Sequence, residues 1–241
     1  MEGRWLSPVI PGMKDIVLLH GATGSKTQMD PLAKMLESDF TIHLLNLPGH
    51  GGTAFPVEGF SIEYFADYVL QYLDDHKITT ASFFGYSMGG YTALYLAKKY
   101  PERVEKIITL ATKFYWDETT AAKEIGLLQP QLIEEKVPAF AAELKNRHAP
   151  ADWKEQLLHT QGLLTRLGKE NTLSLNDYKY IESPCLLLIG DRDKMVTLEE
   201  TTDVYKNLPV GSLAVLPQTV HPIEKVDLRL LKFYINRFCT G

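Results

Sequence analysis

The sequence predicts an α/β protein with a mainly parallel, doubly wound sheet and a helical segment inserted between two of its strands. Three observations support this prediction. Six short and nearly continuous apolar runs alternate with amphipathic stretches, which is typical of strands covered by helices on both faces. Between the fourth and fifth runs, about seventy residues contain no convincing strand. The length of 241 residues fits one domain that carries an insertion.

The apolar runs and the signals between them define the expected elements. Strands are expected at residues 15–21, 41–47, 81–86, 106–111, 184–190 and 212–217. Asp30 and Pro31 are expected as the N-cap and first-turn residues of a helix that continues to residue 38. Ser61 is expected to cap a second helix, which ends near residue 76 and has its apolar residues on one face. A third helix, over residues 88–100, stops at the proline that follows it.

The predicted insertion covers residues 113–183, so that residues 1–112 and 184–241 form the core of the fold. Breaks between its helices are expected near Pro130, Pro150 and Gly168. Such a segment could form a passive bundle at one edge of the sheet. It could also form a cap over the carboxyl ends of the strands.

Composition excludes several classes of function. The formal net charge of −5 argues against non-specific nucleic-acid binding, which needs clustered positive charge. No apolar run approaches the ~18 residues of a membrane span, and the N-terminus lacks the apolar core of a signal peptide. We therefore expect a soluble, cytoplasmic protein. Two cysteines cannot make a disulfide framework, and none of the seven histidines shows zinc-helix spacing, so neither a metal nor a cofactor is expected.

A candidate nucleophile lies where open α/β sheets bind their ligands, beyond the carboxyl ends of the strands. The third strand ends in GYSMGG at residues 85–90, a G-x-S-x-G pattern between a predicted strand and a predicted helix. Glycines allow the sharp turn that pushes the Ser87 hydroxyl out of the sheet. The helix N-terminus behind it favours developing negative charge.

A serine nucleophile needs a base that an acid holds in place, and two N–H groups that bind the oxyanion. The fifth strand ends in GDRD, so Asp191 and Asp193 are both candidate acids. His221 follows the sixth strand and is the candidate base. Met88, next to the serine, and Ala22, after the first strand, are the expected N–H donors. All of these residues lie just past strand ends, so they can converge.

These motifs resemble those of the α/β-hydrolase superfamily, in its single-domain branch with a helical cap. The resemblance covers nearly the whole chain and rests on His221 and four short motifs. The motifs are HGA at 20–22, NLPGHG at 46–51, GYSMGG at 85–90 and GDRD at 190–193. In this branch the acid commonly lies three residues after the strand-end glycine, which selects Asp193. Asp191 would then bond local backbone or Arg192.

Three positions depart from the pattern of this branch. Asn46 stands where an aspartate is usual, at a position that is generally structural. Val220 stands where a glycine often precedes the histidine, and Pro222 restrains the backbone of His221. Only about fourteen residues precede the first strand, so the antiparallel hairpin that often opens this fold is expected to be absent or reduced.

Other functions are compatible with parts of the sequence. GATGSKT at residues 21–27 is similar to a phosphate loop, but Ser25 and His20 stand where that pattern needs glycine. Nucleotide hydrolysis is therefore disfavoured. A triad of Ser87, Asp193 and His221 could instead serve C–C bond hydrolysis, lyase chemistry or perhydrolysis. A ligand receptor, or a bystander with little turnover, is the non-enzymatic alternative.

The preferred hypothesis is a cofactor-independent serine hydrolase that cleaves a small carboxylic ester or thioester through an acyl-enzyme. Ser87, Asp193 and His221 would form its triad. The substrate-binding candidates in the insertion are Phe114, Trp116 and Phe140, although core packing is an equally good interpretation of the aromatic run. The insertion has nine Lys and Arg against eleven Asp and Glu. Without a strong basic field, a small-molecule substrate with a small to medium neutral acyl group is expected.

Overall fold

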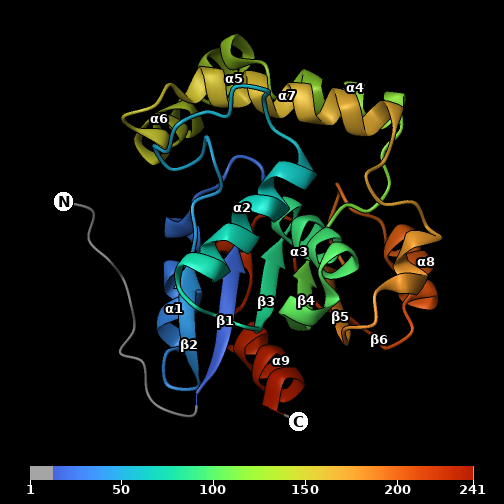
Figure 1. Cartoon of the computed structure of the whole chain (residues 1–241). Helices are drawn as coiled ribbons and strands as arrows, with labels where there is room; N and C mark the ends of the chain where they lie inside the picture. The colour runs from blue at the N-terminus through green and yellow to red at the C-terminus, as the bar shows by residue number, and fades with distance from the viewer. Residues whose placement is uncertain (1–12, 241) are drawn as a thin grey trace.

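The computed structural model describes residues 13–240 and contains one six-stranded sheet in which every strand is parallel to its neighbours (Figure 1). The strand order is β2-β1-β3-β4-β5-β6. The strands are β1 (Lys14–Leu19), β2 (Phe40–Leu44), β3 (Ala81–Tyr86), β4 (Val104–Leu110), β5 (Cys185–Gly190) and β6 (Gly211–Leu216). The predicted parallel α/β sheet is confirmed. The segment in which an opening hairpin would lie, residues 1–12, is outside the described residues.

Helices cover both faces of the sheet, because successive side chains of a strand point to opposite faces. Val17 and Leu19 of β1 belong to one core with α2 (Ile62–Asp75), α3 (Met88–Lys99) and α8 (Leu198–Asn207). Ile16 and Leu18 belong to a second core with α1 (Asp30–Leu36) and α9 (Leu228–Thr240). All four of these side chains are fully buried. The predicted doubly wound arrangement is therefore confirmed.

The two predicted helix caps have different outcomes. The Ser61 side chain accepts a hydrogen bond from the Tyr64 N–H at 3.0 Å, as expected for the cap of α2. For α1 the N-cap is Met29, and Asp30 is already the first helical residue. The reason is that a 3₁₀ turn over Lys26–Met29 leads directly into α1, so the helical backbone begins one residue early.

Residues 113–183 contain four α-helices and no strand. They are α4 (Glu118–Leu127), α5 (Pro130–Lys136), α6 (Pro138–His148) and α7 (Trp153–Lys169). Helix α4 packs against α7, and α5 packs against α6. Figure 1 shows all four beyond the carboxyl ends of the strands. Helices end before Pro130 and Pro150 and just after Gly168, near the expected breaks, and a further break falls at Pro138.

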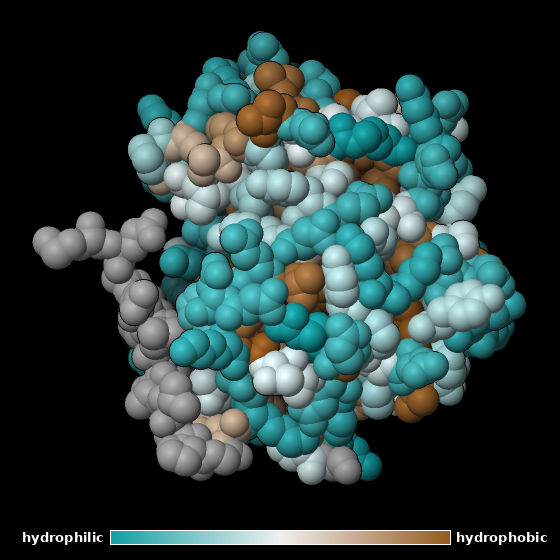
Figure 2. All heavy atoms as spheres, in the orientation of Figure 1, coloured by the Kyte–Doolittle hydropathy of each residue, from teal (hydrophilic) through white to brown (hydrophobic). Residues whose placement is uncertain are grey.

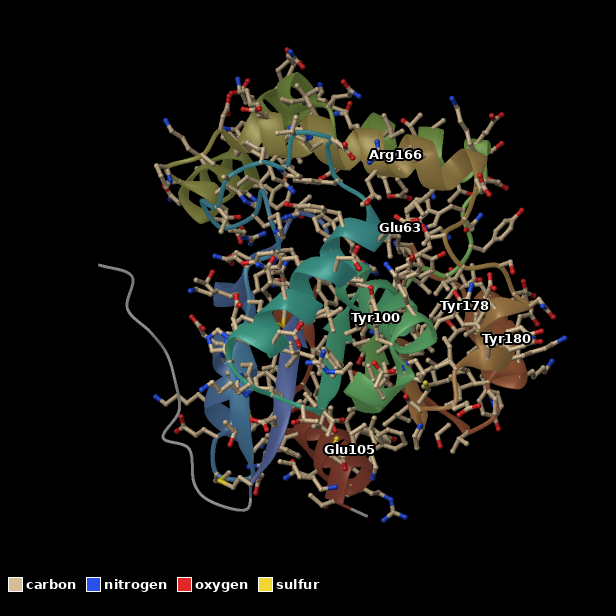
Figure 3. The ribbon with its side chains drawn as sticks, viewed as in Figure 1. Glu63, Tyr100, Glu105, Arg166, Tyr178 and Tyr180 are labelled. Carbon is tan, nitrogen blue, oxygen red and sulfur yellow. The ribbon has the colours of Figure 1, made fainter. Side chains whose placement is uncertain are left out.

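The chain returns from α7 to β5 along the edge of the core. Tyr178 in this segment is buried and Tyr180 is 64% exposed, and Figure 3 shows the two rings. Figure 2 shows a mainly hydrophilic surface with a small hydrophobic group over the inserted helices. Leu132 of α5 and Leu158 of α7 are exposed leucines of the inserted helices. Within residues 13–240, no helix is both long enough and apolar enough to cross a membrane.

Both cysteines of the chain are buried in the sheet core. Cys185 begins β5, as a small apolar strand residue, and Cys239 lies in α9. Burial raises the pKa of the Cys185 thiol to about 12. Burial likewise raises the pKa of Cys239, to about 11.

Candidate active site

Ser87 lies in a strained turn between β3 and α3. Its φ and ψ are 51° and −117°, a backbone conformation that a non-glycine residue keeps only when its surroundings hold it. The Ser87 N–H donates to the Leu110 carbonyl at 2.8 Å, and the Thr112 hydroxyl donates to the Ser87 carbonyl at 3.0 Å. A Cβ on Gly85 would lie only 2.4 Å from the Gly90 Cα, so the turn requires glycine there. The turn places Ser87 in the wall of a pocket.

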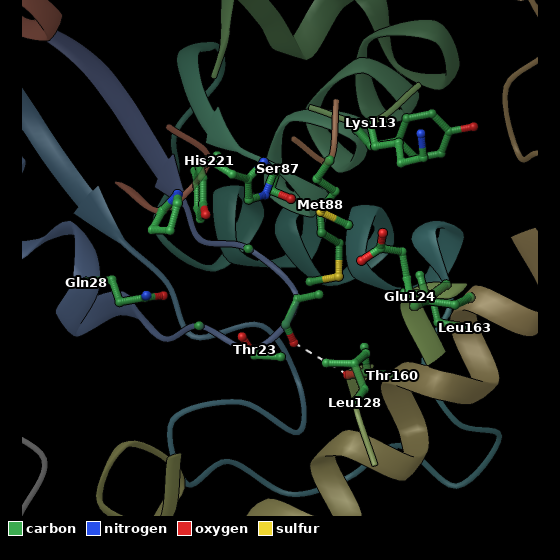
Figure 4. A pocket seen from close by; sticks show the side chains of 18 of the residues that line it. Thr23, Gln28, Ser87, Met88, Lys113, Glu124, Leu128, Thr160, Leu163 and His221 are labelled. Carbon is green, nitrogen blue, oxygen red and sulfur yellow. Dashed lines mark hydrogen bonds between the residues drawn. The ribbon is translucent and has the colours of Figure 1, made fainter. Parts of the chain in front are cut away.

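Asp193 and His221 form a hydrogen-bonded pair beyond the ends of β5 and β6. His221 Nδ1 lies 2.8 Å from Asp193 Oδ2. Asp193 Oδ1 accepts from the N–H groups of Met195 and Val196 at 2.8 and 2.9 Å, and the Asp193 side chain is completely buried. Burial alone would raise the pKa of Asp193, but the hydrogen bonds from His221 and these N–H groups leave that pKa lowered. Asp193 thus holds the His221 ring, which lines the same pocket as Ser87 (Figure 4).

Asp191, the other candidate acid, has different partners. It is exposed, and its carboxylate accepts the Thr219 N–H at 3.1 Å. A hydrogen bond from the Gln218 backbone is the main reason that the pKa of Asp191 is lowered. Asp191 therefore bonds local backbone, whereas the structure brings Asp193 against His221.

The positions that depart from the family pattern leave these contacts intact. Asn46 Oδ1 accepts the Lys26 N–H at 2.7 Å, and the Asn46 amide donates to the Gly51 carbonyl at 3.2 Å. Asn46 therefore ties two loops together without carrying a charge. Val220 precedes His221, which still reaches its carboxylate partner.

The loop after β1 lies against the Ser87 turn. A Cβ on Gly21 would be 3.4 Å from the Ser87 Cβ. The Gly21 carbonyl accepts the Gly24 N–H at 3.0 Å and lies 2.8 Å from His20 Nδ1. In a trans peptide the carbonyl and the following N–H point in opposite directions, so these contacts also fix the direction of the Ala22 N–H. Met88 is the first residue of α3, so its N–H has no acceptor within the helix.

Helices α6 and α7 hold the same loop from its other side. Gln156 of α7 is fully buried, and its amide donates to the Ala22 carbonyl at 2.6 Å. Arg147 and His148, at the end of α6, reach the Thr23 carbonyl at 2.8 and 3.2 Å. The direction of both loop carbonyls therefore depends on helices that come 124 to 134 residues later in the chain.

Three buried histidines anchor this region. The ring centroids of His20 and His50 are 4.9 Å apart, and those of His50 and His148 are 6.0 Å apart. His148 Nδ1 accepts the Gly51 N–H at 3.1 Å, which requires that nitrogen to be unprotonated. Burial is the main cause that lowers the pKa of both His50 and His148 to about 4. Burial also holds the pKa of His20 well below its usual value. The rings of His20 and His148 are therefore neutral near pH 7, because each accepts a backbone N–H on one of its ring nitrogens.

A pocket of about 540 Å³ connects these groups. The sheet side contributes Ser87, His221, Ala22 and Met88. The inserted segment contributes the apolar side chains of Trp116, Leu128, Phe140, Leu163, Leu164 and Leu167 and the polar side chains of Lys113, Glu124, Glu143, Arg147 and Thr160. Figure 4 shows the serine, the histidine and the inserted helix α7 around one space. The site can therefore hold an apolar group next to Ser87.

The predicted substrate-binding aromatics do not all reach the pocket. Trp116 and Phe140 line it, but Phe114 is not among its lining residues. The Phe114 N–H donates to Glu200 at 3.0 Å, and the Phe114 ring packs edge-on against Tyr178. The structure thus corrects the prediction for Phe114, whose side chain belongs to the core because these two partners turn it there.

Several residues of the site were not predicted from the sequence. They are Gln156, His148 and Arg147, which hold the loop, and Lys113 and Glu124, which line the pocket. In the sequence they look like ordinary polar positions of helices and connections, so no local signal marks them. In the described part of the chain, no group of three or more His, Cys, Asp and Glu side chains is placed to hold a metal ion.

Comparison with known proteins supports a hydrolase. The family model described as "alpha/beta hydrolase fold" matches residues 15–225. A pimeloyl-[acyl-carrier protein] methyl ester esterase of Neisseria meningitidis serogroup C is 28% identical over 232 residues, which cover 87% of this chain and 87% of that relative. A Bacillus subtilis protein that bears the name of a 2-succinyl-6-hydroxy-2,4-cyclohexadiene-1-carboxylate synthase is 26% identical, over 94% of this chain and 90% of that relative.

A solved structure shows the same fold. The hydrolase from Pseudomonas aeruginosa PA01 superposes with a TM-score of 0.76 at 17% identity, over 96% of this chain and 92% of that chain. The fold and the enzyme class expected from the sequence are confirmed. Because the family model spans most of the sequence, the chain belongs to the α/β hydrolase fold family.

Proposed function

We propose that this protein hydrolyses carboxylic esters or thioesters of small to medium acyl groups, with Ser87 as the nucleophile. One observation carries the proposal: the strained Ser87 turn and the His221–Asp193 hydrogen bond meet at one pocket. A serine hydroxyl is a weak nucleophile unless a held base removes its proton. The hydrogen-bonded pair supplies such a base.

In this mechanism Ser87 attacks the acyl carbon while His221 accepts the hydroxyl proton. Asp193 keeps the His221 ring oriented and stabilises its charged form. The N–H groups of Ala22 and Met88 bind the negative oxygen of the tetrahedral intermediate. His221 then protonates the leaving alcohol or thiol, and afterwards it activates the water that releases the acyl group.

The inserted helices support the choice of substrate. We propose that residues 113–183 act as a cap on a core of residues 1–112 and 184–241, because α6 and α7 bind the loop after β1 and line the pocket. Their apolar side chains favour neutral acyl chains. The Neisseria relative is by name a methyl ester esterase, which agrees with ester cleavage.

Covalent labelling tests this proposal. A fluorophosphonate probe should add one probe mass to the peptide that contains Ser87, and Ser87→Ala should abolish the labelling. The matched control is Ser212→Ala, at an exposed position of β6, which should label like the wild type. On a panel of p-nitrophenyl esters and acyl thioesters, Ser87→Ala should lose roughly a millionfold in kcat.

The other outcomes point to the alternatives. A folded wild-type protein that is not labelled would contradict an activated serine and favour a ligand receptor. A labelled protein that cleaves no ester or thioester would favour another reaction on the same residues, such as lyase chemistry. The name of the Bacillus relative makes that reaction class the second candidate.

A further inference from the structure

One carboxylate faces the far part of the pocket. Figure 4 shows Glu124 of α4 on the opposite side of Ser87 from His221, beyond Met88, with its carboxylate turned into the pocket. The wall that α4 and α7 form around it is apolar and consists of Leu128, Leu163, Leu164 and Leu167. This carboxylate thus borders an apolar part of the pocket, whose other charged lining residues lie outside α4 and α7: Lys113, Glu143, Arg147, Glu224 and Lys225.

The protein gives this carboxylate no hydrogen-bond donor. Within residues 13–240, no hydrogen bond reaches the Glu124 carboxylate, although its side chain is only 13% exposed. Its ion-pair neighbour is Lys123 Nζ, which lies 3.9 Å away on a side chain that is 68% exposed. A poorly solvated carboxylate without donors is unfavourable, unless something else supplies them.

Glu200 shows how the same fold treats a carboxylate that serves only the structure. Its side chain is 12% exposed, nearly the same as that of Glu124. It accepts hydrogen bonds from the Lys113 ammonium at 3.1 Å and from the backbone N–H groups of Phe114 and Thr197. Lys113 also lines the pocket, and its positive charge is compensated by Glu200. Glu124 has no comparable donors among residues 13–240, and its ion-pair neighbour Lys123 is largely exposed to solvent.

The direction of the substrate follows from the proposed function, on which this inference rests. His221 protonates the leaving alcohol, so the alcohol must lie beside that ring. The acyl chain then extends the other way, past Met88 toward Glu124. We propose that Glu124 binds a hydrogen-bond donor, a hydroxyl or an ammonium group, that the acyl chain carries away from its ester carbonyl. The enzyme therefore prefers hydroxyacyl and aminoacyl esters to esters whose acyl chain ends in a carboxylate.

Four p-nitrophenyl esters of similar length test this preference: heptanoate, 6-hydroxyhexanoate, 6-aminohexanoate and the adipate monoester. In the wild type, kcat/KM for the two donor-bearing esters should exceed that for the adipate ester on the order of tenfold or more. Glu124→Gln should lower this ratio by a similar factor. The matched control is Glu118→Gln, an exposed glutamate on the same helix, which should keep the wild-type ratio. The hydroxyl and ammonium arms tell whether a neutral or a charged donor is preferred.

Three kinetic results would overturn the inference. They are a wild type that prefers the adipate ester, a ratio that Glu124→Gln leaves unchanged, and an equal change in Glu118→Gln. Binding of the corresponding methyl esters to Ser87→Ala, followed by tryptophan fluorescence because Trp116 lines the pocket, needs no turnover. If no ester is cleaved but the binding preference depends on Glu124, the proposed function fails and this inference survives. Equal binding of all four would overturn the inference itself.

Discussion

Replacing Asp193 with asparagine exchanges one carboxylate oxygen for an NH₂ group and reverses the direction of one hydrogen bond. Asp193 Oδ1 accepts two N–H groups, from Met195 and Val196, and Oδ2 faces His221 Nδ1 at 2.8 Å. An asparagine has a single acceptor oxygen, which must remain with the two N–H groups. Its NH₂ group then faces His221 Nδ1 as a donor. His221 is forced to carry its proton on Nε2, and in that tautomer it cannot take the proton of Ser87.

We therefore expect Asp193→Asn to lower kcat about ten-thousandfold, which corresponds to ~5 kcal/mol in the activation barrier. The fold should be preserved, since shape and both N–H hydrogen bonds are kept. The assay is kcat for p-nitrophenyl acetate at neutral pH. Circular dichroism and the unfolding midpoint in urea show whether the variant is folded.

Asp191→Asn is the matched control, because it makes the same change two residues away at a carboxylate that binds the Thr219 N–H. Its kcat should stay close to that of the wild type. A folded Asp193→Asn that keeps more than roughly a tenth of the wild-type kcat would refute the tautomer argument. A larger loss in Asp191→Asn would show that the acid is assigned to the wrong residue.

Three further predictions concern the histidines, the loop and the pocket. Because the pKa values of His50 and His148 are lowered to about 4, against about 6.5 in an unfolded chain, the unfolded chain takes up protons first as pH falls. The free energy of unfolding should therefore decrease as pH falls from about 6.5 to 4, by up to about 1 kcal/mol per pH unit for each histidine. Urea titrations at several pH values measure it, and an unfolding free energy that does not change with pH would contradict this prediction. Gln156→Met removes a donor to the Ala22 carbonyl and should lower kcat about tenfold with little change in KM. The control Gln161→Met, on the same helix, should leave kcat unchanged. If both variants lower kcat equally, the hydrogen bond to the Ala22 carbonyl does not contribute to catalysis. Over p-nitrophenyl esters from acetate to palmitate, kcat/KM should first rise, because each added methylene that is buried contributes up to ~0.8 kcal/mol of binding free energy, and should then fall sharply beyond medium chain lengths. A steady rise of kcat/KM to palmitate would exclude a closed cap.

The strands could be predicted because each is a short run of mostly apolar residues, and β3 and β5 are buried along their whole length on both faces. The predicted ends of the strands were less accurate. The first two predicted strands extend past Leu19 and Leu44, where β1 and β2 end. The residues that follow β2 include Leu45 and Leu47, which are also buried, so hydrophobicity alone does not show where the chain leaves the sheet. Burial continues there because the loops pack under the inserted helices.

The site was predictable only where chain order and strand ends constrain it. Ser87 and His221 follow from such positions, but the choice between Asp191 and Asp193 depends on how one turn directs two side chains. Phe114 and Trp116 are two residues apart, yet the first packs in the core and the second lines the pocket. Their backbone N–H groups bind Glu200 and Asn171, which are 86 and 55 residues away in the chain, so no local pattern could separate them.

The burial of both native thiols has a practical consequence for site-specific labelling of the inserted helices. With pKa values raised to about 12 and about 11, Cys185 and Cys239 form almost no thiolate at neutral pH, so maleimide reagents should spare them in the folded protein. A cysteine placed at Leu158, which is 58% exposed on α7, would then be the single site of attachment. A fluorophore or spin label there would show whether the inserted helices move relative to the sheet, without removal of any native residue from the core.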